Sequence, residues 1–588
     1  MRVTPAYLGY PFYPYVTQSK DQQMRFTRVP GCLVPESVDK VWLMTFEFAG
    51  VASLGGLGNA VRRFAEGLRD QGVKVTVIMP AHGRHYDPEF SARAKLRDFG
   101  LTAEGDRVGL DGNRYHYRIG FEFGELDGVE LILVKGRDHA TSSMLDDPYV
   151  YAHVEEKASL FARAMEALVP HAVSTSAVPS VIHANDWHTA VAGVRARQLF
   201  EDRKYNVPLV YTVHLLNEVS FPWHYASLDW SGLRDCPVYV WKVHRHEVSS
   251  HRELWEQARG NVERFAVLES DAFSSVSRAY LRNVVLPRVG EWLEGKSCVV
   301  YNSTDWRVDE VKAFAERRFG TSDRLELRKR LLNELPNVRA VPEDFNTGNT
   351  LWNARRSLGI RDDWTYEPLG DGPLFVFSGR LVFQKGPDLL VRAFLEAIQE
   401  VRDARLLILG IPSGDYGLLR DLVDHLSRVR DNARIVASKG IDPNLFKAFI
   451  YSATALVMPS RWEPFGLSAV EAMAVGTPVI AYGVDGLSET VIDLRFSSES
   501  GTGFLAHPES VWELKEAIVT ASALSKAYEQ GDGSLMGRAM VDVDWRRVRE
   551  SAMRRVDSEF RPSSTARRLM DCYRKALQMA TYRANSYG

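Results

Sequence analysis

The chain has 588 residues, 45% of them hydrophobic and 25% charged, and its formal net charge at pH 7 is −2. The length is too great for one hydrophobic core, so we expect two large domains, and the near-neutral charge excludes a strong attraction to nucleic acid or anionic lipid. No run approaches the ~20 apolar residues of a membrane helix and the first residues form no apolar signal segment, so we expect a soluble cytoplasmic protein without nucleic-acid or membrane partners.

Four cysteines, Cys32, Cys236, Cys298 and Cys572, are scattered along the chain without metal-ligand spacing. This distribution favours a reducing compartment over a secreted disulfide framework. Because the number is even, one long-range disulfide stays open as an alternative.

The first 40 residues are rich in tyrosine and proline. So many aromatic side chains are costly to leave in water, so residues 1–40 are predicted to form an ordered arm. From residue 41, short apolar runs alternate with longer amphipathic stretches, a pattern typical of a parallel sheet with helices on both faces. The expected strands are 41–48, 73–80, 115–123, 129–134, 180–184, 209–214 and 272–276.

The same pattern then repeats in a second set of strands. A charged, helix-prone linker, 309–371, separates the two sets and ends in glycines and prolines that mark a domain entry. The chain is therefore predicted to be α/β, with two Rossmann-like, doubly wound parallel-sheet domains at 41–308 and 372–561. A ligand cleft is expected between the carboxyl ends of their strands. The second set is 374–377, 405–409, 434–437, 455–458, 478–482 and 503–505.

Two carboxylates eight residues apart, Glu463 and Glu471, follow the expected strand 455–458. Helix-forming residues run from Leu467 through Ala474, so both carboxylates can face the top of the sheet and accept hydrogen bonds from sugar hydroxyls. The spacing alone is weak evidence for a shared site, because two unrelated acidic residues on a helix are often eight positions apart by chance.

The sequence around this pair carries more information. Pro-Ser-Arg-Trp-Glu463-Pro-Phe-Gly-Leu, followed by Glu471-Ala-Met-Ala-Val-Gly-Thr-Pro, resembles the Glu-x7-Glu element of retaining glycosyltransferases with two Rossmann domains, the GT-B fold. The resemblance implies that Glu463 lies at the transferred sugar and that Glu471 holds the nucleotide ribose. It also implies that the donor site is lined by Phe465, Gly466 and Leu467.

Two cations, Arg380 and Lys385, follow the expected strand 374–377 in a glycine-containing loop. A leaving nucleoside diphosphate needs cationic stabilisation, from a metal or from Arg and Lys. The loop resembles the Arg-Leu-x3-Lys-Gly diphosphate site of the glycogen synthase family, and Gly486-Leu487 resembles the family's Gly-Gly-Leu turn, where a helix N-terminus binds phosphate. With these cations present, no metal and no cofactor are expected besides the donor substrate.

A glycine-rich turn, Ser53-Leu-Gly55-Gly56-Leu-Gly-Asn59, follows the first strand. Adjacent glycines before a helix let the backbone approach an anion closely. The turn resembles the family's Lys-x-Gly-Gly-Leu-Gly-Asp motif, which implies that Gly55 and Gly56 bind the donor. Here Ser53 replaces the lysine and Asn59 the aspartate, so the usual cation is missing.

Two strand ends of the first domain carry further polar residues. His183-Ala-Asn-Asp186-Trp187 resembles the family's His-x-x-Asp-Trp signature, which implies that Asp186 and Trp187 lie beside the acceptor. Thr212-Val-His214 matches the family's Thr-x-His, which implies that His214 binds the 6-hydroxyl of the transferred glucose. A lone strand-end histidine would otherwise be interpreted as part of the core.

Two other clusters suggest a metal. Asp542-Val-Asp544 fits an Asp-x-Asp metal motif, but it directly precedes a helical segment, so a helix N-cap is the preferred interpretation. The cluster His244, His246, Glu247 and His251 lacks a familiar zinc spacing. An exposed helical insertion at 220–264 is the preferred interpretation there.

The resemblance to the glycogen and starch synthase family, nearest its archaeal-type members, covers about 41–582 and implies transfer of glucose, with retention, from ADP-glucose or UDP-glucose to the nonreducing end of an α-1,4-glucan. His214, Glu463, Arg380, Lys385 and Asp186 are the predicted catalytic residues. The segment 562–588 is expected to be a helix that returns to the first domain. A related transferase making a disaccharide such as trehalose or a glycoside, an inactive glucan-binding homologue, and a homo-oligomer all stay open.

Overall fold

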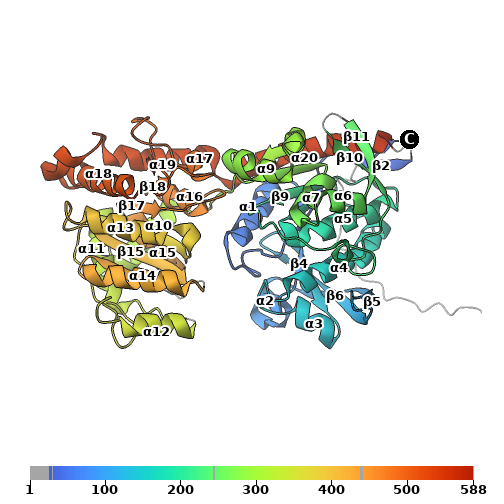
Figure 1. Cartoon of the computed structure of the whole chain (residues 1–588), viewed down its shortest axis with the longest axis horizontal. Helices are drawn as coiled ribbons and strands as arrows, with labels where there is room; N and C mark the ends of the chain where they lie inside the picture. Colours follow the sequence, from blue (N-terminus) through green and yellow to red (C-terminus); the bar gives the residue numbers. More distant parts are fainter. Residues whose placement is uncertain are drawn as a thin grey trace, which may run out of the picture.

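The computed structural model describes residues 26–29, 31–242, 245–342, 344–412, 414–436 and 441–586, and most of the predicted aromatic arm lies outside them. The described end of the arm forms a small antiparallel pair, β1 (Phe26–Val29) and β2 (Cys32–Pro35). The rest of the chain forms two α/β halves that meet along one side (Figure 1).

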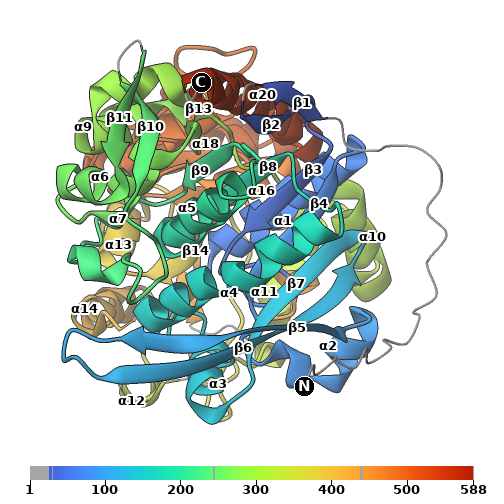
Figure 2. The same cartoon turned by 90° about the vertical axis from the view of Figure 1, so that its right-hand side faces the viewer.

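The first half is built on a nine-stranded sheet with the order β13-β12-β9-β8-β3-β4-β7-β6-β5. Its strands from β13 to β7 are parallel, and β6 and β5 add a long antiparallel edge (Figure 2). All seven strands predicted for this half are confirmed, whereas β5 and β13 were not predicted. The strands are β3 (Lys40–Met44), β4 (Lys74–Pro80), β5 (Arg97–Val108), β6 (Arg114–Leu126), β7 (Val129–Gly136), β8 (Val181–Asn185), β9 (Leu209–Val213), β12 (Ala272–Ser275) and β13 (Ser297–Val299).

Helices cover both faces of this sheet. Alternate residues of β3 divide between two cores: Val41 and Leu43 pack with α1 and α20, while Trp42 and Met44 pack with α4 and α5. This division follows from the period of two along a strand that is buried on both faces. The helices are α1 (Gly56–Asp70), α2 (Pro88–Arg93), α3 (His139–Leu145), α4 (Val154–Ser174), α5 (Trp187–Glu201), α6 (His251–Gln257), α7 (Val262–Glu269), α8 (Arg278–Tyr280), α9 (Leu286–Val289) and α20 (Pro562–Ser586).

The second half is built on a six-stranded, fully parallel sheet with the order β16-β15-β14-β17-β18-β19. All six predicted strands are present, and the two doubly wound sheets confirm the predicted fold class. The strands are β14 (Leu374–Leu381), β15 (Arg405–Pro412), β16 (Ala433–Val436), β17 (Ala455–Met458), β18 (Val479–Tyr482) and β19 (Gly503–Ala506). The helices are α13 (Pro387–Ala397), α14 (Tyr416–Leu426), α15 (Pro443–Ser452), α16 (Leu467–Ala474), α17 (Leu487–Thr490), α18 (Val511–Gln530) and α19 (Trp545–Glu559).

The predicted linker contains three helices that pack on the second half: α10 (Val308–Phe319), α11 (Arg324–Glu334) and α12 (Phe345–Asn353). Arg324 shows how they are attached. Its guanidinium donates to the carbonyl oxygens of Tyr451 and Val475 and lies 3.8 Å from the centre of the Tyr451 ring. The linker is therefore a packed part of the second half.

The last helix, α20, returns to the first half and packs against α1 (Figures 1 and 2). Tyr573 places its hydroxyl 2.8 Å from His183 Nδ1 on β8. Cys572 forms a disulfide with Cys298 on β13, across a Cα–Cα distance of 5.8 Å that suits such a bridge. The structure thus selects the alternative of one long-range disulfide and leaves Cys32 and Cys236 as free thiols.

The expected helical insertion at 220–264 is wrong over its middle part. There β10 (Pro237–Lys242) and β11 (Arg245–Ser250) form an antiparallel hairpin, and α6 follows. The hairpin forms because the alternating residues Val238 and Val240 are buried. No group of three or more metal-ligating side chains occurs within the described residues, which exclude His244.

Asp544 caps the N-terminus of α19 by accepting from the Arg546 amide, which confirms the capping interpretation of that motif. Among the described residues, no helix is long and apolar enough to cross a membrane.

His251 belongs to a buried charge network rather than to an exposed surface. Its Nδ1 lies 2.7 Å from Glu269 Oε1, and Glu269 also binds Arg197. Burial by itself lowers the pKa of His251, but the charge of Glu269 outweighs it and raises the pKa to about 9. The stability from this charged pair is fully present below the unfolded histidine pKa of about 6.5 and is lost as the pH rises through 9.

We therefore expect the free energy of unfolding to fall between pH 6.5 and 9.5 by on the order of 2 kcal/mol more in the wild type than in His251→Gln. Urea unfolding at both pH values measures this difference. The variant retains the other buried groups that titrate in this range, such as Lys296, so the comparison isolates His251. Equal pH slopes in the two proteins would show that His251 is neutral.

Candidate active site

The cations predicted to bind a diphosphate lie at the carboxyl end of β14. Arg380 is exposed, and its Nη2 lies 3.4 Å from Gln384 Oε1. Lys385 ends a short 3-10 helix, and its Nζ forms an ion pair with Glu463 Oε2. Glu463 is 8% exposed and also accepts from Ser460 Oγ at 3.3 Å. The structure thus brings the predicted diphosphate and sugar residues into direct contact.

Gly386 fixes the position of Lys385. It has φ +62°, and a Cβ on it would lie 2.0 Å from the carbonyl oxygen of Pro459. Only glycine avoids both the left-handed strain and this backbone clash.

Gly386→Ala is accordingly expected to displace the Lys385 loop and to lower transferase kcat/KM by at least tenfold, since an error of about 1 Å in positioning costs roughly 10²-fold. Gly537→Ala is the matched control, because a Cβ on Gly537 meets nothing within 4 Å. The two variants are compared in a transfer assay, and normal activity of Gly386→Ala would contradict the positioning role.

Two backbone turns pack together around Glu463. The Gly486 amide donates to the Glu463 carbonyl at 3.0 Å, and a Cβ on Gly486 would lie 2.4 Å from Phe465 Cα. Gly466 has φ +91° and is the N-cap of α16, which spans Leu467 to Ala474 as predicted. Phe465 and Leu487 are buried, so these residues shape the site through the backbone that they hold.

Glu471 lies on α16, where its charged neighbours come from other elements. Burial and the carboxylate of Asp305 raise the pKa of Glu471 to about 7, while Lys447 and Arg63 act in the opposite direction. Arg63 on α1 forms a 2.5 Å ion pair with Asp305. Glu471 therefore stands where the two halves join, and its carboxyl group can form hydrogen bonds with hydroxyl groups there.

In the first half, Asp186 and His214 are in contact. The His214 amide donates to Asp186 Oδ1 at 2.7 Å, and Asp186 has φ +59°, a rare conformation for a residue other than glycine. Burial raises the pKa of Asp186 to about 8. Strain and a shifted pKa together are typical of functional sites.

The imidazole of His214 is held neutral and in one tautomer. Burial lowers its pKa to about 3. Asn185 Nδ2 donates to the Met44 carbonyl at 3.0 Å, so Asn185 Oδ1 is the acceptor that lies 2.9 Å from His214 Nε2. His214 Nε2 therefore carries the proton, and Nδ1 is the ring nitrogen that can accept from a ligand hydroxyl.

Trp187 and His188 are both buried. Trp187 is 9% exposed and packs on Phe221, which leaves little of its ring for an acceptor. His188 is 3% exposed, and neither of its ring nitrogens has a hydrogen-bond partner among the described residues. A buried polar group without a hydrogen-bond partner needs an explanation, and a hydrogen bond to a ligand hydroxyl would supply one.

Glu47 is a site residue that the sequence analysis missed. It follows β3, is 2% exposed, and accepts from the amides of Leu54 at 2.8 Å and Gly55 at 3.0 Å. Ser53 Oγ lies 3.2 Å from it, and the Tyr151 hydroxyl donates to its other oxygen. Glu47 could have been predicted from the sequence, because it is a carboxylate directly after a buried strand, at the carboxyl edge of the sheet.

The glycine-rich turn therefore binds an anion, but this anion is the protein's own carboxylate. The amide of Gly55 is occupied by Glu47 and is not free for a diphosphate, in contrast to the expectation for this turn. A Cβ on Gly55 or Gly56 would meet nothing within 4 Å, so the turn still leaves open space for a ligand. With Ser53 in place of lysine, the donors to Glu47 within the described residues are all neutral.

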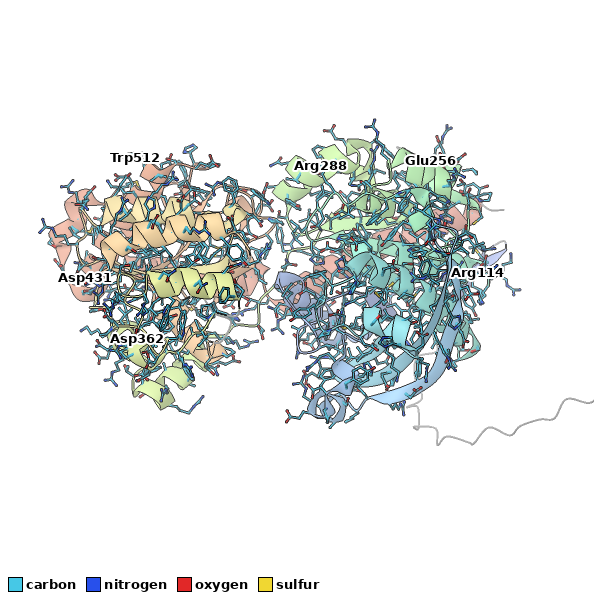
Figure 3. All side chains as sticks on the ribbon, turned by 60° about the horizontal axis from the view of Figure 1, so that its bottom comes forward. Arg114, Glu256, Arg288, Asp362, Asp431 and Trp512 are labelled. Atoms are coloured by element: carbon cyan, nitrogen blue, oxygen red, sulfur yellow. A yellow bond between two sulfur atoms is a disulfide. The ribbon has the colours of Figure 1, made fainter. Side chains whose placement is uncertain are left out.

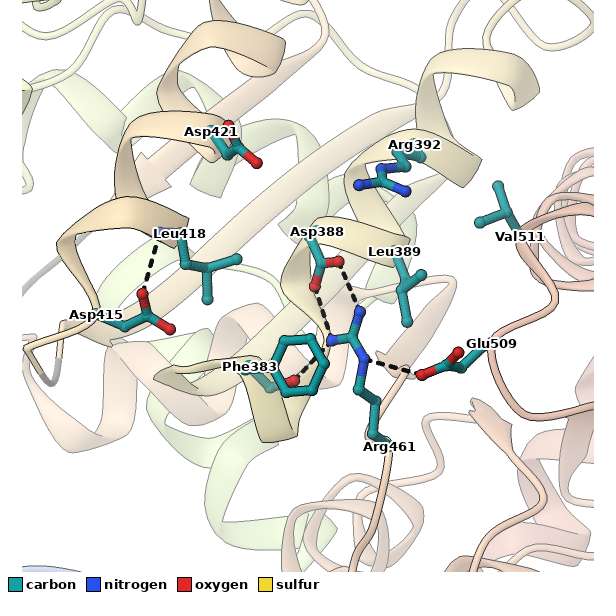
Figure 4. Close-up of a pocket in the computed structure, with 10 residues that line it drawn as sticks. All are labelled: Phe383, Asp388, Leu389, Arg392, Asp415, Leu418, Asp421, Arg461, Glu509 and Val511. Carbon is teal, nitrogen blue, oxygen red and sulfur yellow. Dashed lines mark hydrogen bonds and ion pairs between the residues drawn. The ribbon is translucent and has the colours of Figure 1, made fainter.

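A cavity of about 530 Å³ lies behind the Arg380–Lys385 loop (Figure 4). Arg461 crosses it, with its guanidinium bound to Asp388 at 2.8 Å and to Glu509 at 3.1 Å and lying 3.7 Å from the Phe383 ring centre. None of the predicted site residues line this cavity. Arg461 also donates to the Phe383 carbonyl at 2.7 Å, so these contacts support the Arg380–Lys385 loop.

The structure brings the predicted residues together as two sets: His214 and Asp186 in the first half, and Arg380, Lys385 and Glu463 in the second. Within the described part of the chain, no hydrogen bond or ion pair joins His214 or Asp186 to Arg380, Lys385 or Glu463. The halves touch beside the second set, where Ser277 Oγ donates to the Pro464 carbonyl at 2.7 Å and Arg278 N donates to Glu489 at 3.2 Å. The second set therefore lies near the junction of the halves. Tyr280, three residues after Ser277, accepts from the Leu216 amide at 3.0 Å, so the segment that follows His214 lies close to the same junction.

Comparison with known proteins agrees with this arrangement. Residues 40–296 match the starch synthase catalytic domain, and residues 362–530 match glycosyl transferases group 1. The chain is 27% identical to a glycogen synthase of Thermotoga petrophila, over 92% of this chain and 99% of that protein. It is 26% identical to a glycogen synthase of Exiguobacterium sibiricum, over 82% of this chain and 90% of that protein.

Among solved structures, the catalytic domain of starch synthase IV from Arabidopsis thaliana, bound to ADP and acarbose, has the same fold. The TM-score is 0.63 at 19% identity, over 92% of this chain and all of that one. The two matched regions correspond to the two doubly wound halves, each with its cluster of polar residues. The chain belongs to the glycogen and starch synthase family of GT-B glycosyltransferases.

Proposed function

We propose that this protein transfers glucose, with retention, from a nucleoside diphosphate glucose to the nonreducing end of an α-1,4-glucan. The observation that carries the proposal is the contact of Lys385 with Glu463 beside Arg380, in a chain whose full-length relatives are glycogen synthases. One carboxylate at the sugar and two cations at the diphosphate are the groups that this reaction requires.

Each group has a role in the proposed reaction. The bond between glucose C1 and the diphosphate oxygen breaks, and Arg380 and Lys385 stabilise the negative charge that develops on the diphosphate. The acceptor hydroxyl attacks C1 from the same face and gives its proton to the departing phosphate oxygen. Because two side-chain cations supply the stabilising charge, we propose that no metal or other cofactor takes part.

The first half is proposed to hold the glucose and the acceptor. His214 Nδ1 accepts from a glucose hydroxyl, and Asp186 keeps the His214 backbone in place. Glu47 and Tyr151 form the wall next to the glycine-rich turn. The two sets of residues act together when the halves close around the donor, which also excludes water that would hydrolyse it.

The test is an incubation with radiolabelled ADP-glucose or UDP-glucose and glycogen, in competition and in the presence of EDTA. We expect label in the glucan, released by an enzyme specific for α-1,4 links, and a clear preference for one nucleotide. Transfer to free glucose but not to glycogen would instead support a transferase that makes a disaccharide or glycoside.

A second candidate, a glucan-binding homologue without activity, is favoured by two observations at the glycine-rich turn. Ser53 stands where the family has lysine, and Glu47 occupies the amides of the turn. Glucan binding with neither transfer nor donor hydrolysis would select this candidate.

A further inference from the structure

A small pocket on the first half lies outside the sites described above. It has a volume of about 190 Å³ and lies between the segment after β9, the α6–α7 connection and α9. This volume is below the roughly 300–1,000 Å³ of pockets for drug-sized ligands, so it suits a small molecule. Its charged lining residues are Arg259, Arg264, Arg288 and Glu218.

Three guanidinium groups thus face one carboxylate. Arg288 Nε pairs with Glu218 at 3.0 Å. Neither Arg259 nor Arg264 has a side-chain hydrogen bond or ion pair among the described residues, and the Nε atom of Arg264 is buried without a partner. A buried unpaired donor is costly, and a ligand that accepts hydrogen bonds removes that cost.

We infer that this pocket binds a phosphate group, either as inorganic phosphate or on a small sugar phosphate. The lining has two cationic charges in excess, which match a phosphate dianion. Guanidinium groups bind phosphate through paired, charge-assisted hydrogen bonds. Figure 3 shows Arg288 on the surface of the first half, where α9 approaches the second half (Figure 1).

The pocket is connected to the candidate active site through the chain itself. Residues 216–220 form one of its walls and begin two residues after His214. On their inner side, Glu263 accepts from the Asn217 amide at 2.5 Å, and on their outer side Glu218 binds Arg288. A phosphate group in the pocket would hold this segment from outside and so restrain the backbone that carries His214.

The test measures binding of inorganic phosphate, glucose 6-phosphate and maltoheptaose by calorimetry, at fixed ionic strength. We expect the wild type to bind either both phosphates or the sugar phosphate alone. Binding of both shows that the pocket accepts inorganic phosphate, and binding of the sugar phosphate alone shows that it requires the sugar as well. Arg264→Gln and Arg259→Gln are each expected to weaken this binding about tenfold, the loss of one charge-assisted hydrogen bond. Arg259 is exposed, so its variant is expected to fold normally.

Two controls make the result specific. Arg282→Gln removes an exposed arginine of the same region, paired with Glu294 at 3.5 Å outside the pocket, and is expected to bind like the wild type. Arg380→Ala alters the proposed diphosphate site and is expected to bind both phosphates like the wild type, whether or not the proposed transferase activity exists. Unchanged binding excludes the diphosphate site as the place where the phosphates bind. Hydrogen exchange of residues 216–220 is expected to slow when phosphate is added.

The inference is overturned if neither phosphate binds, if Arg264→Gln and Arg259→Gln bind as well as the wild type, or if Arg282→Gln weakens binding equally. Binding of maltoheptaose without either phosphate would also overturn it, because the pocket would then recognise sugar hydroxyls.

Discussion

Arg380→Ala is expected to lower kcat about 10²- to 10³-fold while KM for the glucan changes little. Arg380 stands exposed at the end of β14, and its only side-chain hydrogen bond among the described residues, to Gln384, is long at 3.4 Å. It is therefore available to a departing diphosphate, whereas Lys385 is already paired with Glu463. A cation that binds charge developing only in the transition state affects kcat.

Steady-state transfer to glycogen with a saturating donor measures this loss. The matched control is Arg392→Ala, which removes an exposed arginine from the neighbouring helix α13 and is expected to retain wild-type kcat. Near-normal turnover of Arg380→Ala would remove the diphosphate role from this residue and leave Lys385 to supply it alone.

The fold could be predicted from the sequence because its strands are buried on both faces. Runs such as 77–79 and 455–458 are continuous and apolar, and each lies where its prediction placed it. The strands that were missed have a different pattern. β5 contains several exposed charged residues, since it lies at the antiparallel edge of the sheet, and β13 has only three residues. Neither has the apolar run by which the other strands were found.

The site residues that could be predicted are those that belong to continuous sequence motifs. Lys385 and Glu463 are 78 positions apart, yet each follows a recognisable strand, and their contact follows from the parallel order of β14 and β17. Glu47 and Tyr151 were missed because their pairing spans 104 positions. Nothing near Tyr151 in sequence indicates that its hydroxyl reaches the end of β3.

Buried charges were the least predictable part of the molecule. Arg197, Glu269 and His251 are each less than 3% exposed, although charged residues are rarely buried. Their burial depends on tertiary partners that one sequence does not reveal. The same network extends through Asp271 and Glu201 to Arg583 on α20, so the C-terminal helix is held by charge as well as by apolar packing.

Arg583→Met is therefore expected to destabilise the protein by on the order of 3–5 kcal/mol, because removing one partner leaves buried carboxylates without compensation. Arg583 is 1% exposed and binds both oxygens of Asp271, at 2.9 and 3.1 Å, and also Glu201. Asp271 in turn accepts from the Leu209 amide at 2.9 Å. The loss would thus reach β9, which leads directly to His214.

Urea unfolding and the rate of trypsin cleavage in α20 measure this effect. Arg574→Met is the matched control on the same helix, because Arg574 pairs, within the described part of the chain, only with exposed Asp571 and such surface pairs contribute about 0–1 kcal/mol. If both variants lost the same stability, the buried charges would not be what holds α20 in place. A selective loss in Arg583→Met, with early cleavage of α20, would instead show that the buried charges anchor this helix beneath the sheet that carries His214.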